Sequence, residues 1–239
     1  MTFLQSAVAW FLDGAHWHGT DGVPNRLSEH LLMSGVSVLA AAIVALPIGI
    51  GLGHRGRGGF VAINVSNVGR AIPSFGLLVI ALQVFGIGAK PAFVALFALA
   101  IPPMMTNSYV GITQVDPDVR EAARGMGMRE RAILFRVEIP LALPLIMAGL
   151  RTSAVQVVAT ATLAALVAWG GLGRYIVDGL AQRDFVQVFC GAVLVAVLSI
   201  IVELALAGLQ RLALPRGLRL TQTTSPDVPR DLTTGLKAA

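Results

Sequence analysis

The chain is poor in the residues on which catalysis and covalent cross-linking depend. Cys190 is the single cysteine among 239 residues, so a disulfide within the chain is excluded. The only lysines are Lys90 and Lys237, and neither stands in a Gly-x4-Gly-Lys-Ser/Thr loop, so this sequence carries no phosphate-binding P-loop. A Gly-x-Ser-x-Gly nucleophile elbow is missing too, and we expect this chain to be no enzyme.

Metal ligands and charged residues are equally scarce. His16 and His18 flank a tryptophan, but no cysteine or carboxylate cluster lies at ligand spacing around them, so we expect no metal site and no cofactor. Charged residues make up 13% of the chain and hydrophobic residues 55%, with a mean hydropathy of +0.75. This composition excludes an ordinary soluble domain and predicts an all-α protein that crosses a membrane several times.

Five uncharged runs of 18 to 24 residues are each long enough to cross a bilayer as a helix, at about 1.5 Å per residue. They cover residues 31–52, 71–89, 91–114, 152–173 and 185–202. Arg70 and Arg151 each stand just before a run, where we expect their long side chains to reach the cytoplasmic headgroups. Glu203 is expected near the same boundary.

Basic residues predict the orientation. If the loop 53–60, the insert 114–138 and the C-terminus share one side, twelve Lys and Arg residues lie there and four lie on the other. The positive-inside rule then places the N-terminus outside and the C-terminus in the cytoplasm of a multi-pass cell-membrane protein. Because the arginines border membrane segments, the net charge of +5 indicates topology and contact with membrane lipid, not nucleic-acid binding.

We divide the chain into three parts. Residues 1–28 include Trp10 and Trp17, whose amphipathic rings favour an extracytoplasmic or interfacial segment. Residues 29–212 form the transmembrane domain. Residues 213–239 are rich in Thr, Pro, Asp and Arg, and we predict a disordered cytoplasmic tail because they offer too little apolar surface to fold.

The insert between the third and fourth runs has its own helix signals. Asp116 can cap a helix N-terminus, Pro117 suits the first helical position, and Gly127 can supply the left-handed residue that ends it. Apolar side chains within this helix repeat at helical spacing, which forms one narrow stripe of Val119, Ala122, Ala123 and Met126. Such a helix either lies on the membrane surface or docks onto a soluble partner.

Motifs in the insert and beyond it resemble a known family. Glu121-Ala122-Ala123, then Gly127 and, after nine intervening residues, Val137-Glu138-Ile139-Pro140 resemble the EAA loop of ABC importer permeases. The rest of residues 30–212 resembles the osmoprotectant branch of that family, through Ile72-Pro73-Ser74, Phe85-Gly86-Ile87-Gly88, Asn107-Ser108-Tyr109, Val115-Asp116-Pro117, Pro140-Leu141-Ala142-Leu143-Pro144, Ala148-Gly149-Leu150-Arg151-Thr152, Thr160-Ala161-Thr162-Leu163-Ala164-Ala165-Leu166 and Gly170-Gly171-Leu172-Gly173.

The resemblance implies a type I ABC importer transmembrane domain, with about five core helices and a cytoplasmic coupling helix. It implies that a cytoplasmic ABC ATPase binds ATP and receives the coupling helix, that an extracytoplasmic binding protein delivers the cargo, and that a second permease, identical or a sister paralogue, completes the path. The cargo would be glycine betaine, choline, carnitine or proline. The expected ATPase-coupling residues are Asp116, Pro117, Val119, Glu121, Ala122, Ala123, Gly125, Met126 and Gly127.

A polar stripe on the fourth run is the candidate translocation path. Thr152, Gln156 and Thr160 are four residues apart and share a helix face, with Ser153 beside them. A polar stripe in lipid must face protein or water, so these side chains either line the path or serve helix packing.

Two other functions stay open at this level. The same architecture can carry another small solute, such as an amino acid or a sulfonate. An ion-coupled carrier or channel is the alternative from another class, but it calls for acidic residues at the middle of the membrane and inverted repeats, which the five runs lack.

Overall fold

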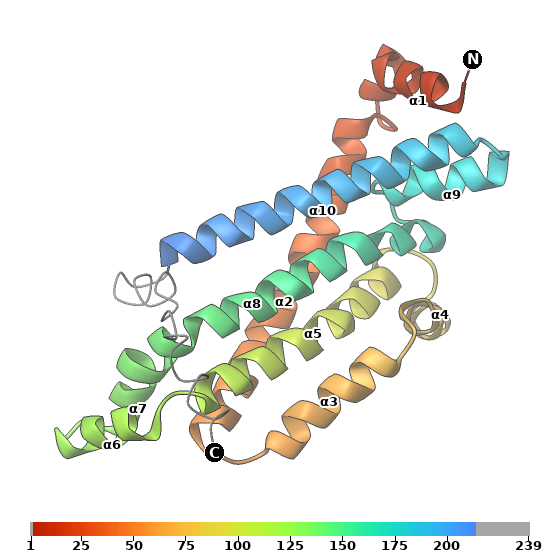
Figure 1. Cartoon of the computed structure of the whole chain (residues 1–239). Helices are drawn as coiled ribbons and strands as arrows, with labels where there is room; N and C mark the ends of the chain where they lie inside the picture. Colours follow the sequence, from red (N-terminus) through yellow and green to blue (C-terminus); the bar gives the residue numbers. More distant parts are fainter. Residues whose placement is uncertain (1, 214–239) are drawn as a thin grey trace, which may run out of the picture.

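A computed structural model describes residues 2–213, except for the side chains of residues 61, 62, 65, 66 and 70. The predicted tail, from residue 214 on, lies outside the described residues. The regular elements within the described part are all helical (Figure 1). In chain order they are α1 (Phe3–Leu12), the 3-10 helix η1 (Gly14–Trp17), α2 (Val23–His54), α3 (Gly59–Ala71), α4 (Ser74–Phe85), α5 (Ala89–Thr113), α6 (Pro117–Gly125), α7 (Glu130–Ile133), the π-helix η2 (Leu134–Glu138), α8 (Ile139–Thr160), the 3-10 helix η3 (Ala161–Val167), α9 (Gly173–Gln182) and α10 (Phe185–Ala213).

Within the described residues four helices are long and apolar enough to cross a membrane, which confirms the predicted all-α membrane architecture. They are α2 with 32 residues, α5 with 25, the continuous helical stretch Glu130–Val167 with 38, and α10 with 29. At about 1.5 Å per residue, each exceeds the roughly 30 Å of a hydrocarbon core.

The second predicted span differs from a single long helix. Within 71–89 the structure has α4, whose 12 residues cover only about 18 Å. Ile72 is extended, with ψ at 121°, because the ring of Pro73 disfavours helical backbone at the preceding residue. The chain therefore bends there: in Figure 1, α3 runs along the bundle, whereas α4 is seen nearly end-on.

The fourth span was predicted to begin at residue 152, but the observed helix begins earlier in the sequence. Its helix α8 starts at Ile139 rather than at residue 152, and the stretch after Thr160 tightens into the 3-10 helix η3. Pro140, the last residue of the EAA-like motif, does not end the helix: it stands in the first turn of α8, directly after the π-helix η2. Arg151 consequently lies well inside the helix.

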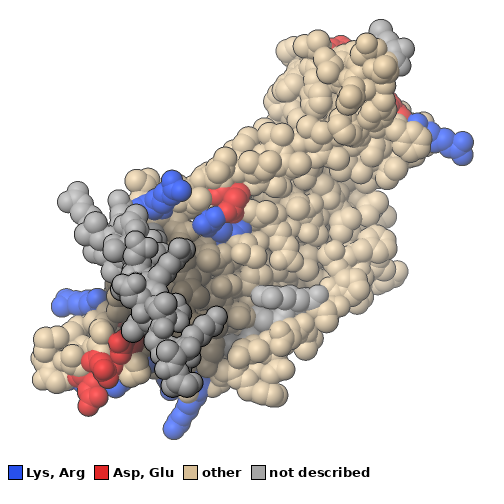
Figure 2. Space-filling model, in the orientation of Figure 1, with Lys and Arg blue, Asp and Glu red and all other residues tan. Residues whose placement is uncertain are grey.

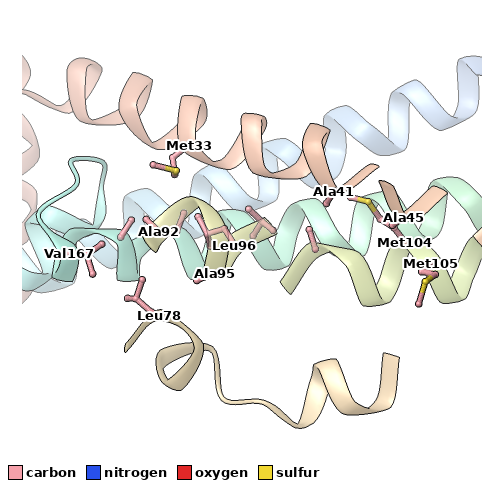
Figure 3. Packing of buried hydrophobic residues seen from close by; sticks show 14 residues of the cluster. Met33, Ala41, Ala45, Leu78, Ala92, Ala95, Leu96, Met104, Met105 and Val167 are labelled. Carbon is pink, nitrogen blue, oxygen red and sulfur yellow. The ribbon is translucent and has the colours of Figure 1, made fainter. Parts of the chain in front are cut away.

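Helix α5 forms the centre of the bundle, packed between α2, α4 and α8. Figure 3 shows apolar side chains of α2 and α5, such as Met33 and Leu96, meeting in this core. Glycines bring α2 and α5 together: a Cβ on Gly53 would lie 2.8 Å from the Cβ of Ile112. Small residues at helix contacts are how membrane helices gain van der Waals packing without a hydrophobic driving force.

The two ends of the bundle differ in what they carry. Helices α6 and α7, the α2–α3 turn and the C-terminal end of α10 gather at one end, whereas α1 and α9 lie at the other (Figure 1). This grouping matches the predicted sharing of one side by the arginine-rich segments. Figure 2 shows most charged side chains of the visible face at these ends, with one mixed patch between them. Which end faces the cytoplasm stays a prediction from the positive-inside rule.

Candidate functional site

The insert folds as the predicted short helix, α6. The Asp116 side chain caps it by accepting from the N–H of Asp118 at 2.9 Å, and Pro117 is its first residue. At the other end Gly127 is left-handed, with φ at +77°. The N–H of Gly127 donates to the carbonyl of Arg124 and the N–H of Met128 to that of Ala123, which together make a Schellman stop.

Most of the predicted coupling residues form the outer surface of α6. Met126 is 75% exposed and Val119 41% exposed, and Asp116, Glu121, Ala122 and Gly127 are exposed as well. A shallow hollow on this helix is lined by Pro117, Arg120, Glu121, Arg124 and Gly125. The apolar stripe does not all face outward, because Ala123 is only 2% exposed and packs inward. Their role in binding an ATPase stays a prediction.

A charged network that the sequence reasoning missed lies beneath α6. Glu138, the last residue of η2, is 1% exposed, and its Oε2 accepts from Nδ1 of His54 at 2.6 Å. Its Oε1 lies 3.0 Å from Nε of Arg120. That Nε makes no hydrogen bond, so the contact is an ion pair without an aligned N–H. Nη2 of Arg120 instead donates to the carbonyl of Ile112 on α5.

A second, exposed ion pair joins α6 to α7. Nε of Arg124 donates to Oε1 of Glu130 at 2.9 Å, and both side chains are more than half exposed. The Glu130 carboxylate raises the pKa of the Arg124 guanidinium above its ordinary value, first by accepting its hydrogen bonds and then by its charge. Because water screens this pair, its contribution to stability is small.

The structure places the predicted path residues on one helix but in different surroundings. Thr152 is exposed, Gln156 is partly buried, and Thr160, also partly buried, lines a small gap together with Leu78 of α4. Ser153 is fully buried and donates to the carbonyl of Ala100 at 2.8 Å, which is a packing contact between α8 and α5. Whether the stripe lines a path stays a prediction.

Arg151 does not lie at a helix end, contrary to the sequence-based expectation. It is thirteenth in α8, and its guanidinium forms an ion pair with Glu203 of α10 and donates to Oε1 of Gln210 at 2.8 Å. The expectation failed because each charge was considered on its own. A charge inside a membrane helix is tolerated when another helix supplies its counter-charge.

The opposite end of the bundle holds a clamped glycine turn. Oε2 of Glu29 accepts from the N–H of Gly171 at 2.7 Å, and a Cβ on Gly170 would lie 1.9 Å from the same oxygen. Beside it the Tyr175 hydroxyl donates to the carbonyl of Asp21 at 2.6 Å. Burial raises the pKa of the Tyr175 hydroxyl to about 12.

The helical arrangement matches that of solved ABC transporter chains. An inward-facing structure of the MetNI methionine ABC transporter aligns with 78% of this chain and 94% of its own, with a TM-score of 0.68 and 24% identity. A crystal structure of an amino acid ABC transporter aligns with 89% of this chain and 97% of its own, with a TM-score of 0.63 and 20% identity. The fold is therefore that of the transmembrane domain of a type I ABC importer, as predicted.

The family follows from the sequence match. Residues 38–216 match the family described as the binding-protein-dependent transport system inner membrane component, and the chain belongs to it. It is a multi-pass permease subunit of the plasma membrane. Membership implies, in general, an ATPase and a substrate-binding protein as partners.

Three curated relatives are permeases of glycine betaine, carnitine or choline transport systems. The glycine betaine/carnitine/choline transport system permease protein OpuCB of Bacillus subtilis (strain 168) is 38% identical over 194 residues, which are 81% of this chain and 89% of the relative. The choline transport system permease protein OpuBB of the same organism is 36% identical, over 80% of this chain and 88% of its own. The carnitine transport permease protein OpuCB of Listeria monocytogenes is 37% identical, over 90% and 97%.

Proposed function

We propose that this permease subunit forms the translocation path for osmoprotectants, namely glycine betaine, choline, carnitine or proline. The observation that carries the proposal is the 38% identity to a glycine betaine/carnitine/choline permease over 89% of that relative's length. The match covers 81% of this chain, so it is not confined to a shared coupling loop.

ATP hydrolysis takes place on a separate cytoplasmic ABC ATPase in this proposal, and α6 is the element that docks into it. Support comes from the missing P-loop and from the firmly capped helix, whose Glu121, Gly125 and Met126 are exposed. A helix whose two ends are capped does not fray, so a displacement by the ATPase moves it as a rigid unit. In the proposed orientation this end faces the cytoplasm, and the N-terminus lies outside.

The other partners follow from the same architecture. An extracytoplasmic binding protein meets the end that carries α1, α9 and the clamped turn at Gly171. A second permease subunit, a further copy or a sister paralogue, covers the apolar surface of α3 and α4, where Phe60, Ile80 and Val84 are exposed. Exposed apolar side chains are stable there only against lipid or protein.

Uptake of labelled cargo tests the proposal. Cells without their own osmoprotectant importers receive the permease with its ATPase and binding protein, and uptake of glycine betaine, choline, carnitine and proline is compared with that of methionine and a sulfonate. Uptake of an osmoprotectant alone is the expected result. Uptake of methionine or the sulfonate instead identifies the same architecture with another cargo, and flux that continues without ATP indicates an ion-coupled carrier or channel.

A further inference from the structure

We propose that Glu138 is a positioning residue that locks the coupling helix to the transmembrane core, so that α2, α5 and α8 move with α6 as one body. This inference rests on the proposed function, because it concerns how a push on α6 reaches the path. Glu138 and His54 lie outside the coupling helix α6, at the junction between the insert and the bundle.

The first observation is the burial of the Glu138 carboxylate. Glu138 is 1% exposed, and a buried carboxylate is retained only when cations or hydrogen-bond donors surround it. Its two oxygens are used in different directions: one is bonded to His54 at the end of α2 and the other is paired with Arg120 on α6. One side chain thus links two residues that are 66 positions apart in the sequence, one on α2 and one on α6.

The second observation is the local backbone. Residues Leu134–Glu138 form a π-helix between α7 and α8, and such wide turns are rare and frequent at functional sites. The turn ends at Glu138 and leads directly into α8. The carboxylate is therefore held at the start of the helix that carries the candidate path residues, Thr152 among them.

The third observation is the stiffness of what the network touches. Arg120 also donates to the carbonyl of Ile112, near the end of α5. Gly53, next to His54, packs so closely on Ile112 that an added Cβ would lie 2.8 Å from that side chain. The ends of α2 and α5 are thus in direct contact at the point where the network binds them. A displacement of α6 therefore displaces both helices.

The lock has an inner and an outer part. The exposed pair of Arg124 and Glu130 joins α6 only to α7, and Nε2 of His54 lies 3.8 Å from Glu130. Removing an exposed partner costs little because water replaces it. Removing the Glu138 charge leaves Arg120 and His54 without their shared buried counter-charge, so the connection to the core depends on Glu138.

The first test uses the purified chain alone, so that it is independent of any partner. Spin labels on cysteines introduced at the exposed Arg55 and Met126 report the distance between the end of α2 and α6, while the fully buried Cys190 stays unlabelled. Glu138→Gln keeps the shape of the side chain and removes its charge. We expect a shifted or broader distance distribution in Glu138→Gln, and the native distribution in Arg136→Gln, which removes an exposed charge from the same turn.

The second test uses the full transporter in vesicles, with glycine betaine as the cargo. In Glu138→Gln we expect the ATPase still to bind, because the outer face of α6 is unchanged. The maximal rate of uptake should fall roughly tenfold, the size of a typical coupling between sites, with no change in the half-saturating cargo concentration. More ATP is then hydrolysed per cargo molecule, which a merely structural defect does not produce.

His54→Gln replaces the imidazole that is bonded to Glu138, at a less buried position. If Glu138→Gln does not fold, the same two measurements on His54→Gln test the inference. Native distance distributions in both variants, or unchanged uptake per ATP, overturn the inference. A native chain that neither binds the ATPase nor imports cargo refutes the proposed function instead, and the distance measurement then still decides whether the lock exists.

Discussion

Gly49 of α2 and Ser108 of α5 lie so close together that a Cβ on Gly49 would sit 2.1 Å from Oγ of Ser108 and 2.5 Å from the carbonyl oxygen of Met105. Ser108 is fully buried and donates to the carbonyl of Met104, so neither it nor the backbone beside it can move away freely. This contact sets the spacing of the two central helices.

Gly49→Ala should therefore force α2 and α5 apart and destabilise the protein by about 1–3 kcal/mol, as overpacking does. Gly51→Ala, on the same helix with nothing within 4 Å of the added Cβ, should be neutral or stabilising by about 0.5–1 kcal/mol. Thermal unfolding of both variants in detergent checks the pair. Equal midpoints would show that α2 and α5 are not held by this contact.

Glu121→Lys should abolish ATP-driven uptake while leaving the fold intact. The side chain is exposed on α6, so the reversed charge meets the ATPase and not the core. Co-purification of the ATPase measures the loss of docking, and the unfolding midpoint of the variant provides the control for folding. Normal uptake in this variant would remove α6 from the coupling surface.

The Tyr175 hydroxyl should titrate near pH 12 in the folded protein, because burial raises its pKa from the ordinary 10.0 to about 12. A raised pKa means that the folded state holds the proton more tightly, so this contribution to stability is complete below pH 10 and is lost as the pH rises to about 12. The chain has two tyrosines, and Tyr109→Phe leaves only Tyr175 to be followed by tyrosinate absorbance. A midpoint near pH 10 would contradict the buried position.

The effects on stability of removing Arg151 and of removing Glu203 should be coupled, because the two side chains form an ion pair. Arg151→Leu and Glu203→Leu each leave an unpaired charge between α8 and α10, and the double variant removes both charges. We expect each single variant to lower stability and the double variant to recover about 1 kcal/mol, the scale of polar contacts between membrane helices. Additive losses in unfolding assays would mean that the two charges act separately.

The features that sequence reasoning placed correctly are the local ones. Asp116, Pro117 and Gly127 determine the start and end of α6 through their own backbone preferences, which do not depend on distant residues. The long apolar helices follow from composition in the same way. The break at Pro73 was also present in the sequence, but a proline does not interrupt an uncharged run, so residues 71–89 were predicted as one span.

The features that were missed depend on contacts between distant residues. His54 and Glu138 are 84 residues apart, and nothing near either one indicates its partner. Arg151 was assigned to a membrane boundary because a lone arginine is costly in lipid, whereas its actual partner comes 52 residues later. Ala123 belongs to the predicted stripe by spacing, but only the packing of α6 on its own chain determines that it faces inward.

The ion pair between α8 and α10 also bears on how the chain is made. A ribosome completes α8 well before it reaches α10, so the guanidinium at position 151 enters the translocation machinery without its acid. The last helix neutralises it on arrival. A chain that stops short of residue 203 leaves this guanidinium in the membrane without the counter-charge that α10 supplies.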